Sequence, residues 1–185
     1  ALLAYLPGAE NEAVLEEVRQ ALVGLAYRDG KADPALLRAL GDKVPLRRAT
    51  AIVALCHERK PEPRATLRKL LIDPAPSVRL RAALALAHAS EPKAVSTLIA
   101  LLADLPEPQG REAQDFLTEL AAEQSPKTVL GADELSRQRC RDAWAAWWLA
   151  TEGNAPLDEL KKRTLTEADR VKALGLIAKL GDDSF

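Results

Sequence analysis

Histidine and carboxylate side chains recur at one spacing in this sequence, which raises the question of metal binding. His57 and His88 lie 31 residues apart, and Glu119 follows His88 after another 31. Two histidines and one carboxylate are the ligand types of a common transition-metal centre. Stacked helices lie about 8–10 Å apart, so these side chains would meet only in favourable rotamers. We therefore expect no metal and no cofactor, and interpret all three as polar residues that face solvent.

Other catalytic arrangements are equally poorly supported. Cys56 precedes His57, but adjacent residues of a helix point about 100° apart, so the imidazole does not face the thiol. Cys56 and Cys140 form no Cys-x-x-Cys pair, which argues against a zinc site or a disulfide framework. The sequence also shows no Gly-rich phosphate loop and no His-Glu-x-x-His motif. We expect a protein without catalytic residues.

The histidines belong to a repeat with a period of 31 residues. The stretch from Asp73 to His88 recurs upstream and downstream without a gap, so that Leu86 corresponds to Leu55 and Leu117. Periods of 20 to 50 residues built from two helices are typical of α-solenoids, in which each helix pair buries its apolar face against its neighbours. The sequence predicts an all-α fold, an α-solenoid of about four helix pairs.

Pro and Gly residues separate the predicted helix pairs. The pairs cover residues 1–28, 33–58, 62–90 and 92–122, and the second helix of the first pair is expected from Glu12 to Arg28. The first helices share a core stripe with the spacing of one helical turn. This stripe consists of Leu36, Leu67 and Leu98, with Leu40, Leu71 and Leu102 one turn later.

An aspartate ends each first helix in the repeats, and an arginine follows six residues later in two of them. The aspartates are Asp42, Asp73 and Asp104, and the arginines are Arg48 and Arg79. Each carboxylate can accept the free N–H groups of the next helix or pair with the arginine that follows it. In the fourth pair Gly110 takes the arginine position and Arg111 follows, so we expect the ladder to be shifted or broken there.

This Asp-then-Arg pattern, with Pro45 and Pro76 opening the second helices and Ala-Ala-x-Ala-Leu within them, resembles HEAT repeats of the short bacterial kind over about residues 1–122. The run from Cys140 to Trp148 is similar to a segment of uncharacterised HEAT-repeat proteins of planctomycete-type bacteria. The resemblance implies a scaffold for protein interaction. A minority of proteins with this fold are enzymes or lyases, so a DNA glycosylase-like protein and a phycobilin lyase-like protein remain alternatives.

The second helices are expected to place one row of side chains on the concave surface, opposite their core face. The row consists of Tyr27, His57, His88 and Glu119, with Thr50, Arg81 and Asp115 beside it. At an offset of 30 residues, Gln20, Val23 and Tyr27 of the first pair correspond to Thr50, Val53 and His57. Because successive helices stack side by side, such a row would face a peptide or another protein.

All three tryptophans lie on one face of a helix that is expected to begin near Asp133. That face spans about 80° at 100° per residue. Aromatic residues beside a repeat array usually cap the end of its core, so we expect Trp144 and Trp148 to be buried against the fourth pair. An exposed aromatic platform is the alternative. The chain is thus divided into a repeat array (1–122), a loop with a Trp-rich capping helix (123–152), and a linker with the first helix of a further repeat (153–185).

Charge and hydropathy restrict the classes of partner that the protein is expected to bind. A net charge of −1 and a pI near 6.2 argue against nucleic acid, whose binding needs clustered Lys and Arg. No run of about 18 apolar residues is present, which argues against membrane insertion. No small-molecule ligand is implied. We expect a soluble protein, cytoplasmic or extracytoplasmic, whose partner is another protein or another domain of its parent chain. A final helix from Thr166 to Leu180 would lack its partner helix.

Overall fold

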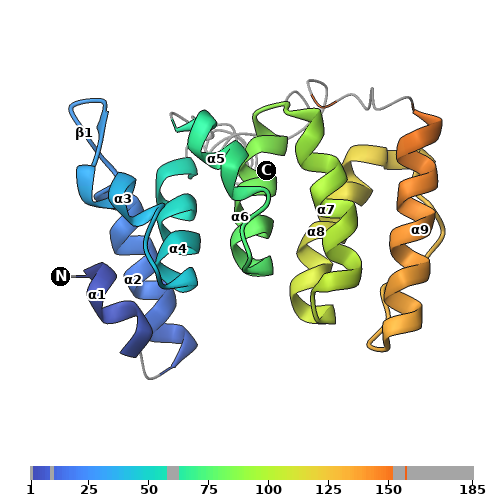
Figure 1. Ribbon diagram of the computed structural model, residues 1–185, viewed down its shortest axis with the longest axis horizontal. Coiled ribbons are helices and arrows are strands. Elements are labelled where there is room, and N and C mark those ends of the chain that lie inside the picture. The colour runs from blue at the N-terminus through green and yellow to red at the C-terminus, as the bar shows by residue number, and fades with distance from the viewer. Residues whose placement is uncertain (1, 9–10, 58–62, 152–156, 158–185) are drawn as a thin grey trace, which may run out of the picture.

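The computed structural model of the protein describes residues 2–8, 11–57, 63–151 and 157. The described helices stand in a row from the N-terminal α1 and α2 to α9 at the opposite end (Figure 1). This arrangement confirms the predicted all-α solenoid. The expected helix from Thr166 to Leu180 lies outside the described residues.

Four helix pairs and a ninth helix make up the row. The pairs are α1 (Leu2–Tyr5) with α2 (Glu12–Gly24), α3 (Pro34–Ala39) with α4 (Pro45–Cys56), α5 (Arg64–Leu70) with α6 (Pro76–His88), and α7 (Pro92–Asp104) with α8 (Glu107–Ala121). The last helix is α9 (Glu134–Ala150), and short 3-10 turns follow α1 (Leu6–Gly8) and α8 (Ala122–Gln124).

The sequence fixes where these helices begin. Proline occupies the first turn of α3, α4, α6 and α7, where its missing N–H is not needed and its fixed φ suits the helix. Side chains cap the starts of α2, α3 and α9. Asn11, Asp33 and Asp133 each accept a hydrogen bond from a backbone N–H of the following first turn. The start of α9 next to Asp133 agrees with the sequence prediction.

The first pair departs from the prediction at its end. The helix expected to reach Arg28 ends at Gly24, and a short antiparallel hairpin follows, with β1 (Tyr27–Arg28) paired to β2 (Lys31–Ala32). Asp29 and Gly30 form its turn with φ values of 52° and 74°. Two successive positive φ angles suit an Asp-Gly hairpin turn, and this turn ends the helix early.

The second helices and α7 form the continuous centre of the row. Helix α2 packs against α4, α4 against α6, and α6 against α7, which also contacts α8 and α9. The predicted core leucines lie between these layers. Leu36, Leu40, Leu67, Leu98 and Leu102 are buried, whereas Leu71 is half-buried.

Helix α9 closes the described row by packing on α7. Trp144 is fully buried there and meets Trp147 edge-on, with 5.4 Å between ring centroids. Trp148 is only half-buried, so the expectation of a buried Trp148 holds only in part. The reason is its position on the flank of α9, where one side of the indole faces a surface cleft. Among the described residues, no helix is both long enough and apolar enough to cross a membrane.

Candidate functional site

A buried ion pair fixes the spacing of the second and third helix pairs. The Nε and Nη2 atoms of Arg48 donate to the two carboxylate oxygens of Asp73, at 2.8 and 2.7 Å. The same guanidinium donates through Nη1 to the carbonyl oxygen of Asp42, at 2.7 Å. One arginine therefore joins the turn of its own pair to the turn of the next. A bidentate, charge-assisted pair of this kind constrains orientation as well as distance.

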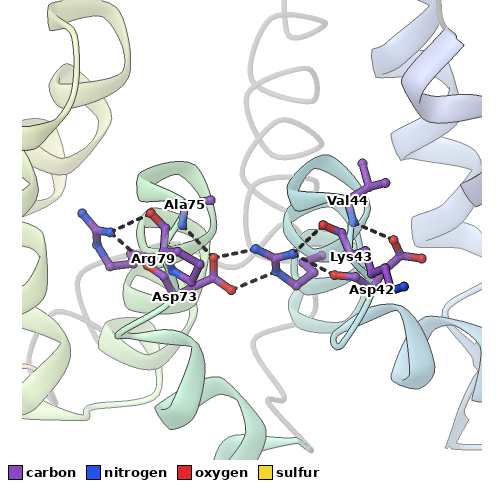
Figure 2. Close-up of polar contacts among 8 residues, drawn as sticks. Asp42, Lys43, Val44, Asp73, Ala75 and Arg79 are labelled. Atoms are coloured by element: carbon purple, nitrogen blue, oxygen red, sulfur yellow. Dashed lines mark hydrogen bonds and ion pairs between the residues drawn. The ribbon is translucent and has the colours of Figure 1, made fainter.

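The same unit is repeated one pair further along. Arg79 donates to the carbonyl oxygen of Asp73 at 2.9 Å and to the carboxylate of Asp104 at 2.7 Å. The carboxylates of Asp42 and Asp73 also accept the backbone N–H two residues later, from Val44 and Ala75 (Figure 2). Of the two roles that the sequence suggested for each aspartate, the carboxylate accepts backbone N–H groups of the following segment. The other role, pairing with the arginine six residues later, was wrong. The arginine reaches the carbonyl oxygen of that aspartate, and its charge pairs with the aspartate of the following repeat.

The ladder ends at Asp104 because Gly110 provides no side chain to continue it. A Cβ atom at Gly110 would lie 2.9 Å from Cδ2 of Leu130, so the loop before α9 occupies the space where an arginine would project. Arg111 instead pairs with Glu107 within α8. The break in the ladder thus coincides with the place where the loop and α9 replace a regular repeat.

A cleft of about 140 Å³ opens across the second helices of the first three pairs, of which the ladder joins the second and third. We call it the inner groove. It is lined by Glu16, Arg19, Gln20 and Val23 from α2, Val53 from α4 and His57 at its end, and Arg81 from α6. Three helices from three successive pairs therefore contribute to one site, and none of them could form it alone.

Charged side chains within the groove are organised by hydrogen bonds. The Glu16 carboxylate accepts Nε2 of Gln20 at 2.8 Å and Nη1 of Arg19 at 3.4 Å. The hydrogen bond from Gln20 is the largest cause that lowers the pKa of Glu16 below its usual value, and the charges of Arg19 and Arg81 lower it further. Arg81 also pairs with Glu112 of α8, which extends the polar network to a fourth helix.

Comparison with known proteins bears on the segment that carries the ladder. Residues 34–117 match the family model described as HEAT repeats. The match runs from α3 into α8 and supports a HEAT-repeat protein with a HEAT-like solenoid fold. HEAT repeats commonly serve as scaffolds for protein interaction and are typically non-catalytic. No curated protein and no solved structure matches the chain.

Two of the residues expected on the concave surface of the HEAT-like array line the inner groove. His57 caps the end of α4 and is exposed, and Arg81 reaches into the groove from α6. Thr50 does not belong with them. It is buried, with 2% of its surface exposed, because α4 is packed between α2 and α6 and loses its flanks as well as its core face.

The remaining residues of the expected row do not gather at one point. The hydroxyl of Tyr27 donates to the carbonyl oxygen of Leu55 at 2.9 Å, so this side chain ties the hairpin to α4. His88 meets Phe116 of α8 edge-on, with 5.1 Å between ring centroids. Asp115 and Glu119 are exposed on α8 and do not line the groove. Among the described residues, no group of three or more His, Cys, Asp or Glu is arranged to hold a metal ion.

Burial acts against a reactive thiol at Cys56. It raises the pKa of this thiol to about 11, so the group is a neutral thiol at physiological pH. Burial likewise raises the pKa of Cys140, which lies in the core beside Trp144. Both cysteines therefore behave as small apolar side chains.

Two groove residues were missed from the sequence. Glu16 and Arg19 were passed over because the repeat comparison placed only Gln20 and Val23 of α2 on this face. A helical wheel contained the missing signal, since Glu16 lies one turn before Gln20 and Arg19 one turn before Val23.

A second, apolar cleft of about 280 Å³ lies at the other end of the array. It is formed between α7 and α9 and is lined by Ser96, Ile99, Ala100, Arg141, Ala145, Trp148 and Leu149. Leu149 has 80% of its surface exposed. This cleft explains the incomplete burial of Trp148.

Proposed function

We propose that the chain is a non-catalytic HEAT-repeat scaffold that binds another protein, or another domain of its parent chain, through its concave face. The inner groove is the proposed contact site. The observation that carries this proposal is the assembly of one groove from α2, α4 and α6, which belong to three successive pairs. The Arg48–Asp73 pair holds the second and third of these pairs in register.

The chemistry of the groove favours a protein surface over a small ligand. Pockets for cofactors and drug-sized molecules usually measure about 300–1,000 Å³, well above the volume of the inner groove. Its lining mixes the apolar Val23 and Val53 with charged groups, as protein interfaces do.

The charge of the neighbouring helix favours protein over nucleic acid. Glu112, Asp115 and Glu119 give the adjoining face of α8 an acidic character. A phosphate backbone would be repelled there, because binding of nucleic acid depends on basic side chains that replace counterions.

The finer assignments are also proposals. Residues 140–148 resemble a segment of HEAT-repeat proteins of planctomycete-type bacteria, which supports an origin of this protein in such bacteria. The break at Gly110 supports the division into an array (1–122), a loop with a capping helix (123–152) and a C-terminal segment (153–185). We further propose that the protein is soluble.

Affinity capture with paired variants tests the proposed function. The tagged chain would be used to capture proteins from a lysate of its source organism, in parallel with Val53→Asp and Ile72→Asp. Val53 lines the groove, whereas Ile72 is an apolar residue outside it with 86% of its surface exposed. We expect Val53→Asp to lose the captured partner and Ile72→Asp to retain it. Circular dichroism would verify that both variants are folded, and equal capture by both would contradict the proposal.

A further inference from the structure

The inner groove has room for one side chain of a partner rather than for a whole ligand. Its volume of about 140 Å³ suits a group of a few heavy atoms. We propose that this group is the carboxylate of an Asp or Glu side chain in a protein partner. The inference deepens the proposed function and rests on it.

Donors from α2, α6 and the end of α4 line the groove beside one carboxylate. The guanidinium groups of Arg19 and Arg81 and the imidazole of His57 lie there with the carboxylate of Glu16, and Arg81 also pairs with Glu112 of α8. Glu16 is already bonded to Gln20 and Arg19. A carboxylate from a partner would therefore bind donors that Glu16 does not use.

Arg81 is the donor best placed to receive that carboxylate. It bonds to Glu112 through Nη1, and within the part of the chain that the structure describes its Nε and Nη2 atoms form no hydrogen bond. These two N–H groups are the fork that binds carboxylates in bidentate fashion. The charge of Arg81 also lowers the pKa of Glu16, which places its positive field inside the groove.

The apolar walls of the groove indicate which groups of the partner lie next to its carboxylate. Val23 and Val53 are half-buried and line the same cleft. They would contact the methylene groups of Asp or Glu and an apolar residue next to it in the partner. A lysine or arginine side chain carries no hydrogen-bond acceptor, so it could not use the N–H groups of Arg81. The geometry therefore selects an acidic residue with an apolar neighbour.

Selection from a displayed library of random 12-residue peptides tests this preference. The 185-residue chain would be the target, and enriched peptides would be synthesised with a fluorescent label for affinity measurement. We expect Asp or Glu to be enriched at one position beside an apolar residue. Replacing that acidic residue by Asn or Gln in the peptide should weaken binding at least about tenfold, as for a lost charge-assisted hydrogen bond.

Matched variants of the protein then locate the bound carboxylate. Arg81→Gln and His57→Ala should each weaken binding of the acidic peptide, with the larger effect, about tenfold or more, for Arg81→Gln. Arg68→Gln is the control, because Arg68 is an exposed arginine of α5 that pairs with Glu91 away from the groove. It should leave the affinity unchanged. His57 is exposed, so His57→Ala gives a second readout if Arg81→Gln reduces stability.

Three results would overturn the inference. One is enrichment of Lys or Arg, or of peptides without an acidic residue. Another is an affinity for the acidic peptide that neither Arg81→Gln nor His57→Ala changes. The third is the absence of any enriched peptide. Peptides that lack an acidic residue but lose binding to Val53→Asp would overturn only the carboxylate preference and would leave the scaffold function standing.

Discussion

Arg48 binds two successive interhelical turns with one side chain. Its side chain is 10% exposed and that of its partner Asp73 is 6% exposed, whereas Asp104, the partner of Arg79, is 50% exposed. Loss of a buried cation leaves a desolvated carboxylate without its counter-charge, while an exposed pair is replaced by water at little cost. The two rungs of the ladder should therefore contribute unequally to stability.

Alanine substitutions along the ladder test this inequality. We expect Arg48→Ala to lower the free energy of unfolding by about 3–5 kcal/mol, because it leaves Asp73 buried and unpaired. Arg79→Ala should cost about 1–2 kcal/mol through its half-exposed pair and its bond to the Asp73 carbonyl. Arg81→Ala should cost about 0–1 kcal/mol. Urea unfolding followed by circular dichroism measures all three, and equal losses for Arg79→Ala and Arg81→Ala would contradict the account.

The burial of Cys56 makes a second residue-scale prediction. A thiol whose pKa is raised from 9.0 to about 11 has about a hundredth of the thiolate at pH 8 that an unperturbed thiol has, partly offset by the higher nucleophilicity of that thiolate. We expect modification of Cys56 by a disulfide reagent in the Cys140→Ala variant to be at least about tenfold slower than that of an unfolded control in urea. Modification as fast as that of the unfolded chain would show that the thiol is accessible and ionised.

At the scale of single helices, local sequence signals account for most boundaries. Pro45, Pro76 and Pro92 mark helix starts, and Asp133 predicts the cap of α9. The hairpin after α2 was not predicted, although Asp29-Gly30 is a strong turn signal. Its strands are two residues long, too short to show an alternating pattern, and the 30-residue offset between α2 and α4 suggested a helix through Tyr27.

The capping helix α9 makes an element-scale prediction through its tryptophans. Trp144 is fully buried, while Trp147 and Trp148 are half-buried. In single-tryptophan variants with Phe at the other two positions, we expect Trp144 to emit at the shortest wavelength and to resist quenching by iodide. Trp148 should be quenched more strongly, because it lines the cleft between α7 and α9. Equal quenching of the two would be inconsistent with α9 as a cap packed on α7.

At the scale of the molecule, the repeat period predicted the stacking of the helices but not every contact between them. Recurrence of Asp and Arg places these residues at equivalent turns, and it leaves open whether an arginine pairs with its own aspartate or with the next one. Only the distance between stacked turns decides this for Arg48 and Asp73. The burial of Thr50 was missed for a related reason, since a wheel drawn for one helix does not include its lateral neighbours α2 and α6.

The same limit applies to the candidate site. The repeat placed His57 and Arg81 on one face, and both line the inner groove. It could not show that His88 packs against Phe116 or that Tyr27 bonds to Leu55, because these contacts depend on how far successive helices are displaced. The resemblance to HEAT repeats suggested a protein partner, whereas the contact site required the stacking of three helices.

Hydrogen exchange with and without a bound partner tests the central claim most directly. The partner recovered by the affinity capture would be added to the purified chain, and amide exchange would be followed by mass spectrometry across the described helices. We predict increased protection in α2, in the second half of α4 and in α6 around Arg81, the segments that line the inner groove. Protection confined to α7 and α9, around the apolar cleft at Trp148, would contradict the account and would assign binding to the end of the array.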